Sequence, residues 1–187
     1  MLLPDSETLA QASAKETKRS AVLDAAAAEF NARGISGASL ARIAKVVGIG
    51  RAALYYYVKD RDDLAAQCYR KSCDIMAADL HAAGQVAGDG LARVLAFLRA
   101  SLDPKRPQTA VLSEVAHLES ATRRRIALAQ GANVEALRAL IRLGIADGSI
   151  HKCEDEIVAQ TLIGTITWIP LSVDWVEGTR EDFRIRT

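Results

Sequence analysis

Apolar residues recur every three or four positions along most of the chain, whereas runs that alternate apolar and polar residues are scarce. This spacing predicts amphipathic α-helices rather than β-strands. The expected helices span residues 15–33, 39–47, 51–57, 62–83, 91–102, 109–118, 121–147 and 154–176. Gly34 and Gly48 are expected to end the first two helices, and the Ser39 hydroxyl is expected to cap the second. We therefore expect an all-α protein.

The connections between these helices divide the chain in two. Three short helices come first, and a charged connection near residue 60 leads into a much longer helix. A glycine-rich link at residues 84–90 and a two-proline segment at residues 103–108 then separate further helices. We expect an N-terminal three-helix domain over residues 13–61 and a C-terminal helical bundle over residues 62–187.

Charge divides the chain at the same place. Of the 187 residues, 24 are Lys or Arg and 23 are Asp or Glu, so the net charge is only +1. Residues 13–59 nevertheless hold eight basic residues against three acidic ones, while residues 60–187 hold sixteen against eighteen. A small basic unit on a larger, slightly acidic one is the layout expected when one end of a protein meets a phosphate backbone.

Residues 39–57 have the spacing of a helix-turn-helix. Ala44 is small enough for two helices to cross closely, and Gly48 turns the chain between them. Ile43, Val47, Ile49 and Leu54 are expected to bury the junction. The second helix of such a motif lies in the major groove of DNA.

Four residues of that second helix are expected to face outward: Arg51, Ala52, Tyr55 and Tyr56. Their guanidinium, methyl and phenol groups suit contacts with phosphates and base edges. Lys59 and the backbone amides that begin the preceding helix at Ser39 are expected to hold further phosphates. The pattern therefore favours a DNA-binding surface at the basic end of the chain.

The segment GISGASLARIAKVVGIGRAALYYYVKDRDDL resembles the N-terminal signature of the TetR family of bacterial transcriptional regulators. The shared pattern is a glycine, a Ser-capped helix, an Ile-Ala pair, a glycine turn, Leu-Tyr-Tyr, and a lysine before an acidic helix start. The resemblance covers residues 17–66. The chain departs from it at Gly50, Tyr57 and Val58, where the family usually has Ser or Thr, His, and Phe.

This resemblance implies an all-helical homodimer, joined through C-terminal helices, that binds a pseudo-palindromic operator in double-stranded DNA. It further implies a repressor whose operator binding is relieved by a small-molecule inducer in the C-terminal domain. Carried over residue by residue, the family's DNA contacts fall on Ser39, Arg51, Ala52, Tyr55, Tyr56, Tyr57 and Lys59. Three consecutive tyrosines span about 200° of a helix, so at least one of them faces outward.

The C-terminal bundle carries weaker signals. The default ligand site is an apolar cavity between helices. Its candidate lining, chosen from mid-bundle positions, is Tyr69, Cys73, Met76, Leu95, Leu98, His117, Leu118 and Trp168. Residues 159–176 are very apolar for a terminal helix, which predicts that a second copy of the chain covers them. Residues 179–187 are typical of the start of one more helix.

Several other classes are disfavoured. No stretch of about 18 unbroken apolar residues occurs, and the first residues do not resemble a secretory leader, so we expect a cytoplasmic protein without a membrane span. Cys68, Cys73 and Cys153 are an odd number of cysteines, which favours reduced thiols. Their spacing and that of the histidines fits no metal site, and no cofactor motif is present.

Three alternatives stay open. A thiol-responsive regulator would sense oxidants at one of the cysteines, and an effector-independent regulator would lack an apolar cavity. An enzyme would use Cys73 as a nucleophile, or Glu114 and His117 as an acid and base one helical turn apart. Because no set of nucleophile, base and oxyanion donors is spelled out in the sequence, we expect no catalytic residues.

Overall fold

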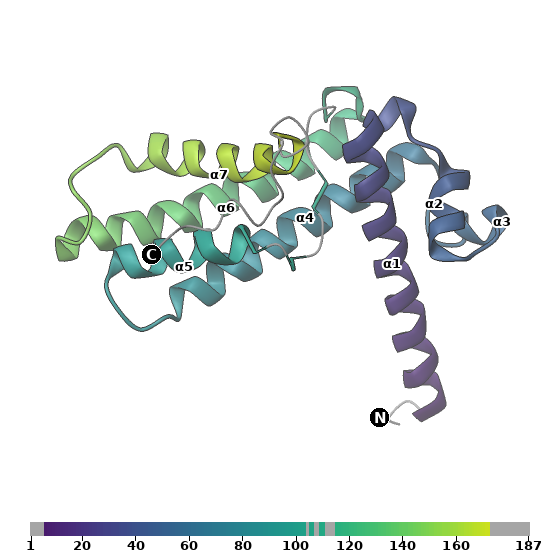
Figure 1. Ribbon diagram of the computed structural model, residues 1–187, viewed down its shortest axis with the longest axis horizontal. Helices are drawn as coiled ribbons and strands as arrows, with labels where there is room; N and C mark the ends of the chain where they lie inside the picture. The colour runs from purple at the N-terminus through teal and green to yellow at the C-terminus, as the bar shows by residue number, and fades with distance from the viewer. Residues whose placement is uncertain (1–5, 104, 107–108, 111–114, 173–187) are drawn as a thin grey trace.

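The computed structural model describes residues 6–103, 105–106, 109–110 and 115–172. Over those ranges the chain forms seven α-helices and one short 3₁₀-helix, and no strand. The elements are α1 (Ser6–Gly37), α2 (Leu40–Val47), α3 (Arg51–Leu54), α4 (Arg61–Gly84), α5 (Gly90–Ser101), η1 (Val115–His117), α6 (Ser120–Asp147) and α7 (Asp155–Ser172) (Figure 1). The predicted all-α class is confirmed.

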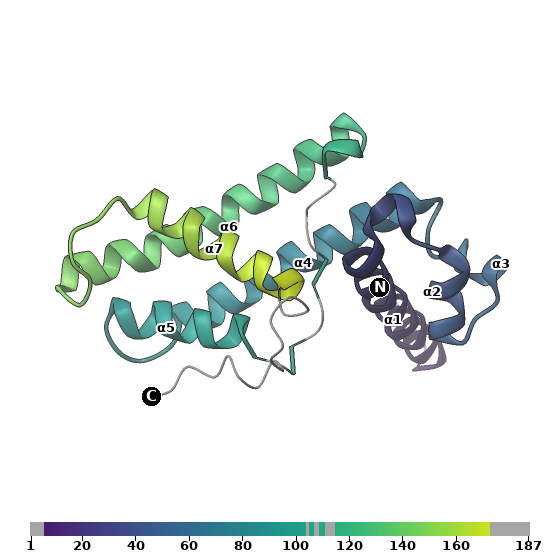
Figure 2. The same ribbon diagram turned by 45° about the horizontal axis from the view of Figure 1, so that its top comes forward.

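Helices α1, α2 and α3 gather at one end of the molecule, and α4, α5, α6 and α7 form a bundle at the other (Figures 1 and 2). Helix α4 belongs to both, because it starts beside α1 and runs on into the bundle. The N-terminal half of α1 extends past the bundle and lies on the same side as α2 and α3 (Figure 1). Helices α1, α2 and α3 thus lie at one end of α4.

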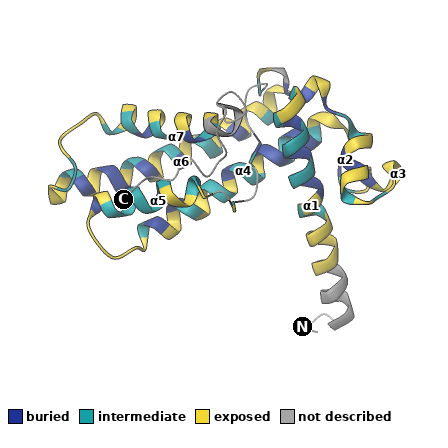
Figure 3. Cartoon of the chain, in the orientation of Figure 1, coloured by how far each residue is buried: buried dark blue, intermediate teal, exposed yellow. Residues whose placement is uncertain are grey.

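Buried residues form two separate clusters. Figure 3 shows the buried positions along the helices in dark blue. The first joins α1, α2, α3 and the start of α4 to Ile126 of α6, with Val22, Phe30, Ile43, Leu54, Leu64 and Tyr69 also among its members. The second joins the end of α4 to α5, α6 and α7, with Leu80, Phe97, Leu137, Ile141 and Ala159. Because α4 contributes to both clusters, a shift of this helix changes the packing of both.

The predicted boundaries hold for most helices, with α1 starting earlier than expected. Gly34 interrupts α1 with φ 69° and ψ 170°, and glycine tolerates such a positive φ. The regular helix is therefore broken at the glycine that the sequence predicts as its end. Residues 173–176 of the last expected helix, and the further helix expected at residues 179–187, lie outside the described residues.

The helix expected over residues 109–118 is wrong. Thr109 and Ala110 are not helical. Of residues 115–118, Val115–His117 form the short 3₁₀-helix η1. The Ala110 N–H donates to the Ser72 hydroxyl at 2.9 Å, and the Thr109 carbonyl accepts the Asn31 side-chain amide at 2.8 Å. These backbone groups therefore bond to α4 and α1 rather than within a helix of their own.

Candidate DNA interface

Helix α2 begins and ends as its sequence predicts. Ser39 has an extended backbone, and its hydroxyl accepts the Arg42 N–H at 3.3 Å. Gly48 ends the helix with φ 70°, a left-handed conformation that costs little without a side chain. Ile43 and Ala44 are buried against α1 and α3, so core packing stabilises the turn between α2 and α3.

Helix α3 is shorter than expected, since it is α-helical over Arg51–Leu54 and not over residues 51–57. Gly50 begins it without any side-chain cap, as its replacement of the family's Ser or Thr predicts. Residues 55–57 continue in a turn, where the N–H groups of Tyr56 and Tyr57 bond to carbonyls three residues back, at 3.2 and 2.9 Å. This tighter turn changes the directions of the three tyrosines.

The residues expected to contact DNA are mostly exposed around this turn. Arg51, Ala52 and Lys59 are exposed, and Tyr55 and Tyr56 keep 47% and 69% of their surface open to solvent. Leu54, between them, is fully buried. The fold therefore brings five of the seven predicted contacts to the surface of one short segment.

The other two predicted contacts are half-buried. Tyr57 packs against the first core, and its ring meets the Tyr56 ring edge-on, with centroids 5.4 Å apart and planes at 88°. Ser39 lies at the start of α2, where its hydroxyl already accepts one bond. Val58, which replaces a Phe of the family pattern, is buried in the same core.

A carboxylate of α1 occupies the start of α2. Glu29 Oε1 accepts the Ser39 N–H at 3.0 Å and two guanidinium nitrogens of Arg42 at 2.8 and 2.7 Å. The hydrogen bond from Arg42 lowers the pKa of Glu29, against a smaller opposing effect of burial. The Ser39 amide, which the sequence suggested for a phosphate, is therefore already bonded inside the chain.

Lys15 of α1 lies beside the tyrosine turn, and sequence reasoning missed it. Its ammonium sits over the Tyr56 ring, 4.7 Å from the centroid. Lys15 and Lys18 are both exposed on the N-terminal half of α1. Two lysines three residues apart are visible in the sequence, but only the fold brings α1 next to the turn after α3.

Gln67 of α4 connects this turn to two helices. Its amide nitrogen donates to the Tyr57 carbonyl at 3.3 Å and to Asp63 Oδ2 at 3.0 Å, and its amide oxygen accepts an Arg19 guanidinium nitrogen at 2.7 Å. Asp63 Oδ2 also accepts the Lys59 N–H at 2.9 Å. The turn that carries the tyrosines is thus bonded to the first part of α4 and, through Gln67, to α1.

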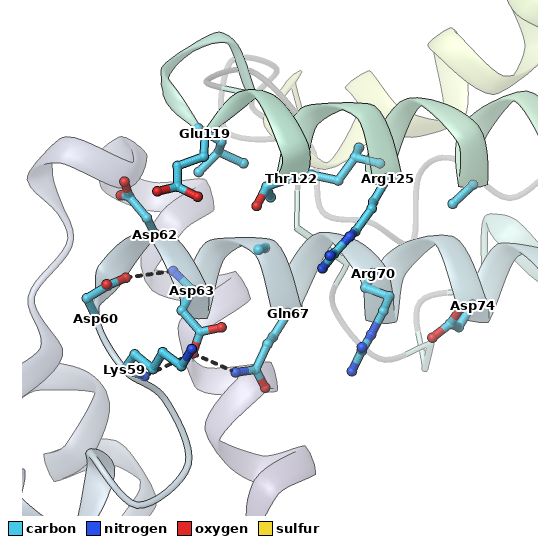
Figure 4. Close-up of a pocket in the computed structure, with 14 residues that line it drawn as sticks. Lys59, Asp60, Asp62, Asp63, Gln67, Arg70, Asp74, Glu119, Thr122 and Arg125 are labelled. Carbon is cyan, nitrogen blue, oxygen red and sulfur yellow. Dashed lines mark hydrogen bonds between the residues drawn. The ribbon is translucent and has the colours of Figure 1, made fainter.

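A groove of about 620 Å³ lies between α4 and α6 next to these bonds (Figure 4). It is lined by Lys59, Asp60, Asp62, Asp63, Ala66, Gln67, Arg70, Asp74, Leu118, Glu119, Thr122, Arg125, Ile126 and Ala129. Asp62 and Glu119 point toward one another across its mouth (Figure 4). Charged groups of both signs therefore line this groove, unlike the apolar cavity that the sequence predicts.

Two family models match most of the chain. The model described as "Bacterial regulatory proteins, tetR family" matches residues 22–68, and that described as "Tetracyclin repressor-like, C-terminal domain" matches residues 91–171. The chain belongs to the TetR family. The resemblance seen in the N-terminal signature is confirmed, and the helix-turn-helix of α2 and α3 is that of this family of transcription regulators.

Individual proteins resemble this TetR family chain over part of its sequence or in its fold. The HTH-type transcriptional regulator AcrR of Shigella flexneri is 39% identical over 59 residues, which are 32% of this chain and 27% of that protein. A structure of AibR in complex with isovaleryl coenzyme A and operator DNA has a TM-score of 0.72 at 22% identity, over 88% of this chain and 92% of that one. The ketosteroid transcriptional regulator KstR2 of Mycobacterium tuberculosis has a TM-score of 0.67 at 21% identity, over 86% and 85%.

The residues expected to line a ligand cavity do not gather in one place. Tyr69 and Leu118 belong to the first core, whereas Met76 and Leu98 pack against the second. Cys73 is buried and Leu95 half-buried, Trp168 is 57% exposed, and the side chain of His117 lies outside the described residues. Among the eight, Leu118 lines the groove between α4 and α6.

The two cysteines of α4 are buried. Burial raises the pKa of Cys68 to about 12, and the Cys68 thiol donates to the Leu23 carbonyl at 3.5 Å. Burial also raises the pKa of Cys73. Cys153, in the link between α6 and α7, is exposed. Because a thiolate is the reactive form, the two buried thiols are poor oxidant sensors.

Within the described part of the chain, no helix is both long and apolar enough to cross a membrane. The same residues include no group of three or more His, Cys, Asp or Glu side chains arranged to hold a metal ion.

Proposed function

We propose that this TetR family chain is a dimeric, sequence-specific DNA-binding repressor, released from its operator by a small molecule that binds the C-terminal domain over residues 62–187. The observation that carries the DNA-binding part is the exposed group Arg51, Ala52, Tyr55 and Tyr56, held on a short, bonded turn of the basic N-terminal domain over residues 13–61. An arginine can bond a guanine edge in two places, and phenols donate to phosphates. Ser39, Tyr57 and Lys59 flank this group.

An exposed face of α7 supports dimerisation. Ile157, Thr161, Gly164, Thr165 and Trp168 are all exposed, and their spacing of three or four residues puts them on one side of the helix. Ile157 and Trp168 keep 64% and 57% of their surface open to solvent. Small residues between two large apolar ones let a second helix approach closely, so a second copy of the chain is the expected cover.

The dimer would present two α3 segments to successive major grooves about 34 to 36 Å apart, which suits a pseudo-palindromic operator. Helix α4 is the expected route from ligand to DNA, since Leu64 lies in the first core and Leu80 in the second. A ligand moves such an equilibrium only by binding one arrangement better than the other. The inducer is therefore expected to favour an α4 position that misplaces the two α3 segments.

Selection of bound sequences from a random pool of duplex DNA, at a defined salt concentration, tests the DNA-binding part. A pseudo-palindromic sequence is expected to be enriched, with half-sites about one DNA turn apart. Failure of a folded, dimeric protein to enrich any sequence would contradict the proposal.

Sedimentation measurements test the dimer face. Trp168→Glu places a charge on the exposed side of α7 and is expected to shift the protein from dimer to monomer. Val46→Glu is the matched control, because Val46 is 76% exposed on α2, far from that face. A W168E protein that stays dimeric would show that the subunits meet elsewhere.

Thermal unfolding with added isovaleryl coenzyme A tests the ligand part, since the solved relative AibR was crystallised with that compound and operator DNA. A ligand at 100 times its dissociation constant stabilises the folded protein by about 2.7 kcal/mol. Free coenzyme A is the control for the acyl group. Stabilisation accompanied by release of the selected DNA supports an acyl-bearing inducer, and no stabilisation excludes this compound.

A further inference from the structure

Tyr56 combines high exposure with contacts on two sides. The ring is 69% open to solvent, yet the Lys15 ammonium lies 4.7 Å from its centroid, and the Tyr57 ring meets it edge-on at 5.4 Å. Tyr57 itself packs against the first core and is backed by Gln67 through its carbonyl. The Tyr56 ring therefore contacts the first core by way of Tyr57.

An exposed tyrosine without such contacts samples several rotamers, and binding must then restrict it. A cation over the face of an aromatic ring favours one ring orientation because the face carries negative charge. No carboxylate within the described residues forms an ion pair with Lys15, so its ammonium is not drawn away from the ring. The contact thus acts on the side chain of Tyr56 before any DNA arrives.

We infer that Lys15 is a specificity-determining positioning residue, which holds the Tyr56 ring in the orientation used against DNA and makes the N-terminal half of α1 part of the DNA interface. This inference rests on the proposed DNA-binding function. A phenol held in one orientation meets one arrangement of base edges and phosphates well and others poorly. Lys15 therefore contributes to discrimination between sequences, whereas an exposed lysine elsewhere on α1 adds only general affinity.

Lys18 provides the matched control. It lies on the same half of α1, is also exposed, and has the same charge, but among the described residues no aromatic ring contacts its ammonium. Lys15→Gln and Lys18→Gln therefore each remove one positive charge, but Lys15→Gln also removes the contact with the Tyr56 ring. Lys15→Arg keeps a cation that also stacks on aromatic faces, so it is expected to behave as the unchanged protein.

A measurement on the protein without DNA tests the geometry. The side-chain protons next to the Lys15 ammonium are expected to show a ring-current shift in NMR spectra, which Tyr56→Leu abolishes. The chemical shifts of the corresponding Lys18 protons are expected to be the same in the unchanged protein and in the Tyr56→Leu variant. A Lys15 resonance that Tyr56→Leu leaves in place would overturn the inference.

The ratio of affinities for the selected sequence and for a scrambled duplex tests the role in recognition. Lys15→Gln is expected to lower this ratio by about two- to five-fold, the effect of one exposed cation–π contact. Lys18→Gln is expected to weaken both complexes equally and to leave the ratio unchanged. In the Tyr56→Leu background, Lys15→Gln should change the ratio no more than Lys18→Gln does, because the ring it acts through is gone.

Equal ratios for Lys15→Gln and Lys18→Gln, in a protein that still selects a sequence, would overturn the inference and leave the proposed function intact. A wild-type protein that selects no sequence would remove the proposed function and the inference together. Both lysines are exposed, so thermal unfolding of the two Gln variants is expected to match that of the unchanged protein.

Discussion

At the DNA-binding end, side chains bond to backbone groups at the ends of short elements, whereas the bundle of α4, α5, α6 and α7 combines such bonds with a close backbone contact. Glu29 of α1 accepts the Ser39 amide, Arg61 of α4 donates to the Ser36 carbonyl at 2.9 Å, and Gln67 donates to the Tyr57 carbonyl. Each bond is directional and holds the end of a short element.

The bundle has a close backbone contact where α5 meets α6. A Cβ built on Gly90 would collide with the backbone of Gly144, and a Cβ on Gly144 would collide with Ile150. Phe97 and Leu137 are fully buried nearby in the second core. The absence of side chains lets the two helices approach, and the Asp147 carboxylate of α6 accepts the Gly90 N–H at 2.8 Å at the same place.

The difference follows from helix length. Helices of four and eight residues are too short to be stable alone, so α3 and α2 need bonds to α1 and α4 to hold their directions. Helix α6 has 28 residues and packs an apolar face, with Leu137 and Ile141, into the second core. Directional bonds therefore set the directions of the short helices, while in the bundle close packing is added to such bonds.

The largest effect is expected from Gly90→Ala, which forces the backbones of α5 and α6 apart. We expect the free energy of unfolding to fall by about 3 kcal/mol, at the upper end for overpacking a well-packed contact. Urea unfolding measures it. Gly131→Ala is the control, because Gly131 lies in α6 with open space around it and should gain about 0.5 to 1 kcal/mol. Equal effects at both glycines would contradict the close contact.

Arg51→Ala is expected to weaken DNA binding by about 1 to 3 kcal/mol and to leave stability within about 0.5 kcal/mol, since Arg51 is exposed. Affinities for the selected and scrambled duplexes at one salt concentration measure the loss. A larger loss on the selected duplex indicates a base contact, and an equal loss on both indicates a phosphate contact. Arg124→Ala, an exposed arginine of α6, should change neither affinity.

Glu29→Gln removes the charge that binds Arg42 and caps α2. We expect the free energy of unfolding to fall by about 1 kcal/mol at pH 7, the usual size for a lost cap. The lowered pKa of Glu29 means that its carboxylate stabilises the fold above its ordinary pKa of 4.5, and that this contribution is lost as the pH falls through the lowered value.

The free energy of unfolding, measured from pH 7 downward, tests whether the contribution of Glu29 is lost in acid. The difference between the unchanged protein and the E29Q variant should shrink below pH 4.5 and vanish once the carboxyl is protonated. Glu16→Gln, an exposed change on α1, should show no difference at any pH. A gap between the unchanged protein and the E29Q variant that persists in acid would show that the charge of Glu29 is not what stabilises α2.

The smallest effect is expected at the thiols. Ellman's reagent should modify Cys153 in the folded protein and reach Cys68 and Cys73 only on unfolding, because burial raises the pKa of both. Peroxide treatment is expected to leave the affinity for the selected DNA unchanged. A loss of affinity that Cys153→Ser prevents would favour the thiol-responsive alternative.

Features of the fold that depend on residues within one or two helical turns were predictable from the sequence. The Ser39 hydroxyl caps α2, Gly48 ends it, and Leu54 is buried because apolar spacing and caps act within one or two helical turns. The family signature pointed to the exposed group around Arg51 for the same reason, since the motif is continuous in the chain. The end of α3 was missed, because a turn of three tyrosines has no breaker residue to mark it.

The candidate site was only partly predictable. Lys15 and Tyr56 are 41 positions apart, and nothing in the composition of α1 signals that it passes beside this turn. Gln67 was missed because an amide on a long helix looks like any solvated residue. The groove between α4 and α6 was missed for a similar reason, as charged residues on two helices are ordinarily taken as outer faces.

The sequence by itself determined most of the helices and the residues of the helix-turn-helix, because each depends on neighbours within a few residues. Only the tertiary structure decided which groups meet across helices: Glu29 with the Ser39 amide, Gly90 with Gly144, and Lys15 with the Tyr56 ring. These contacts depend on crossing positions and angles set by both cores at once. Periodicity along one helix carries no information about where another helix crosses it.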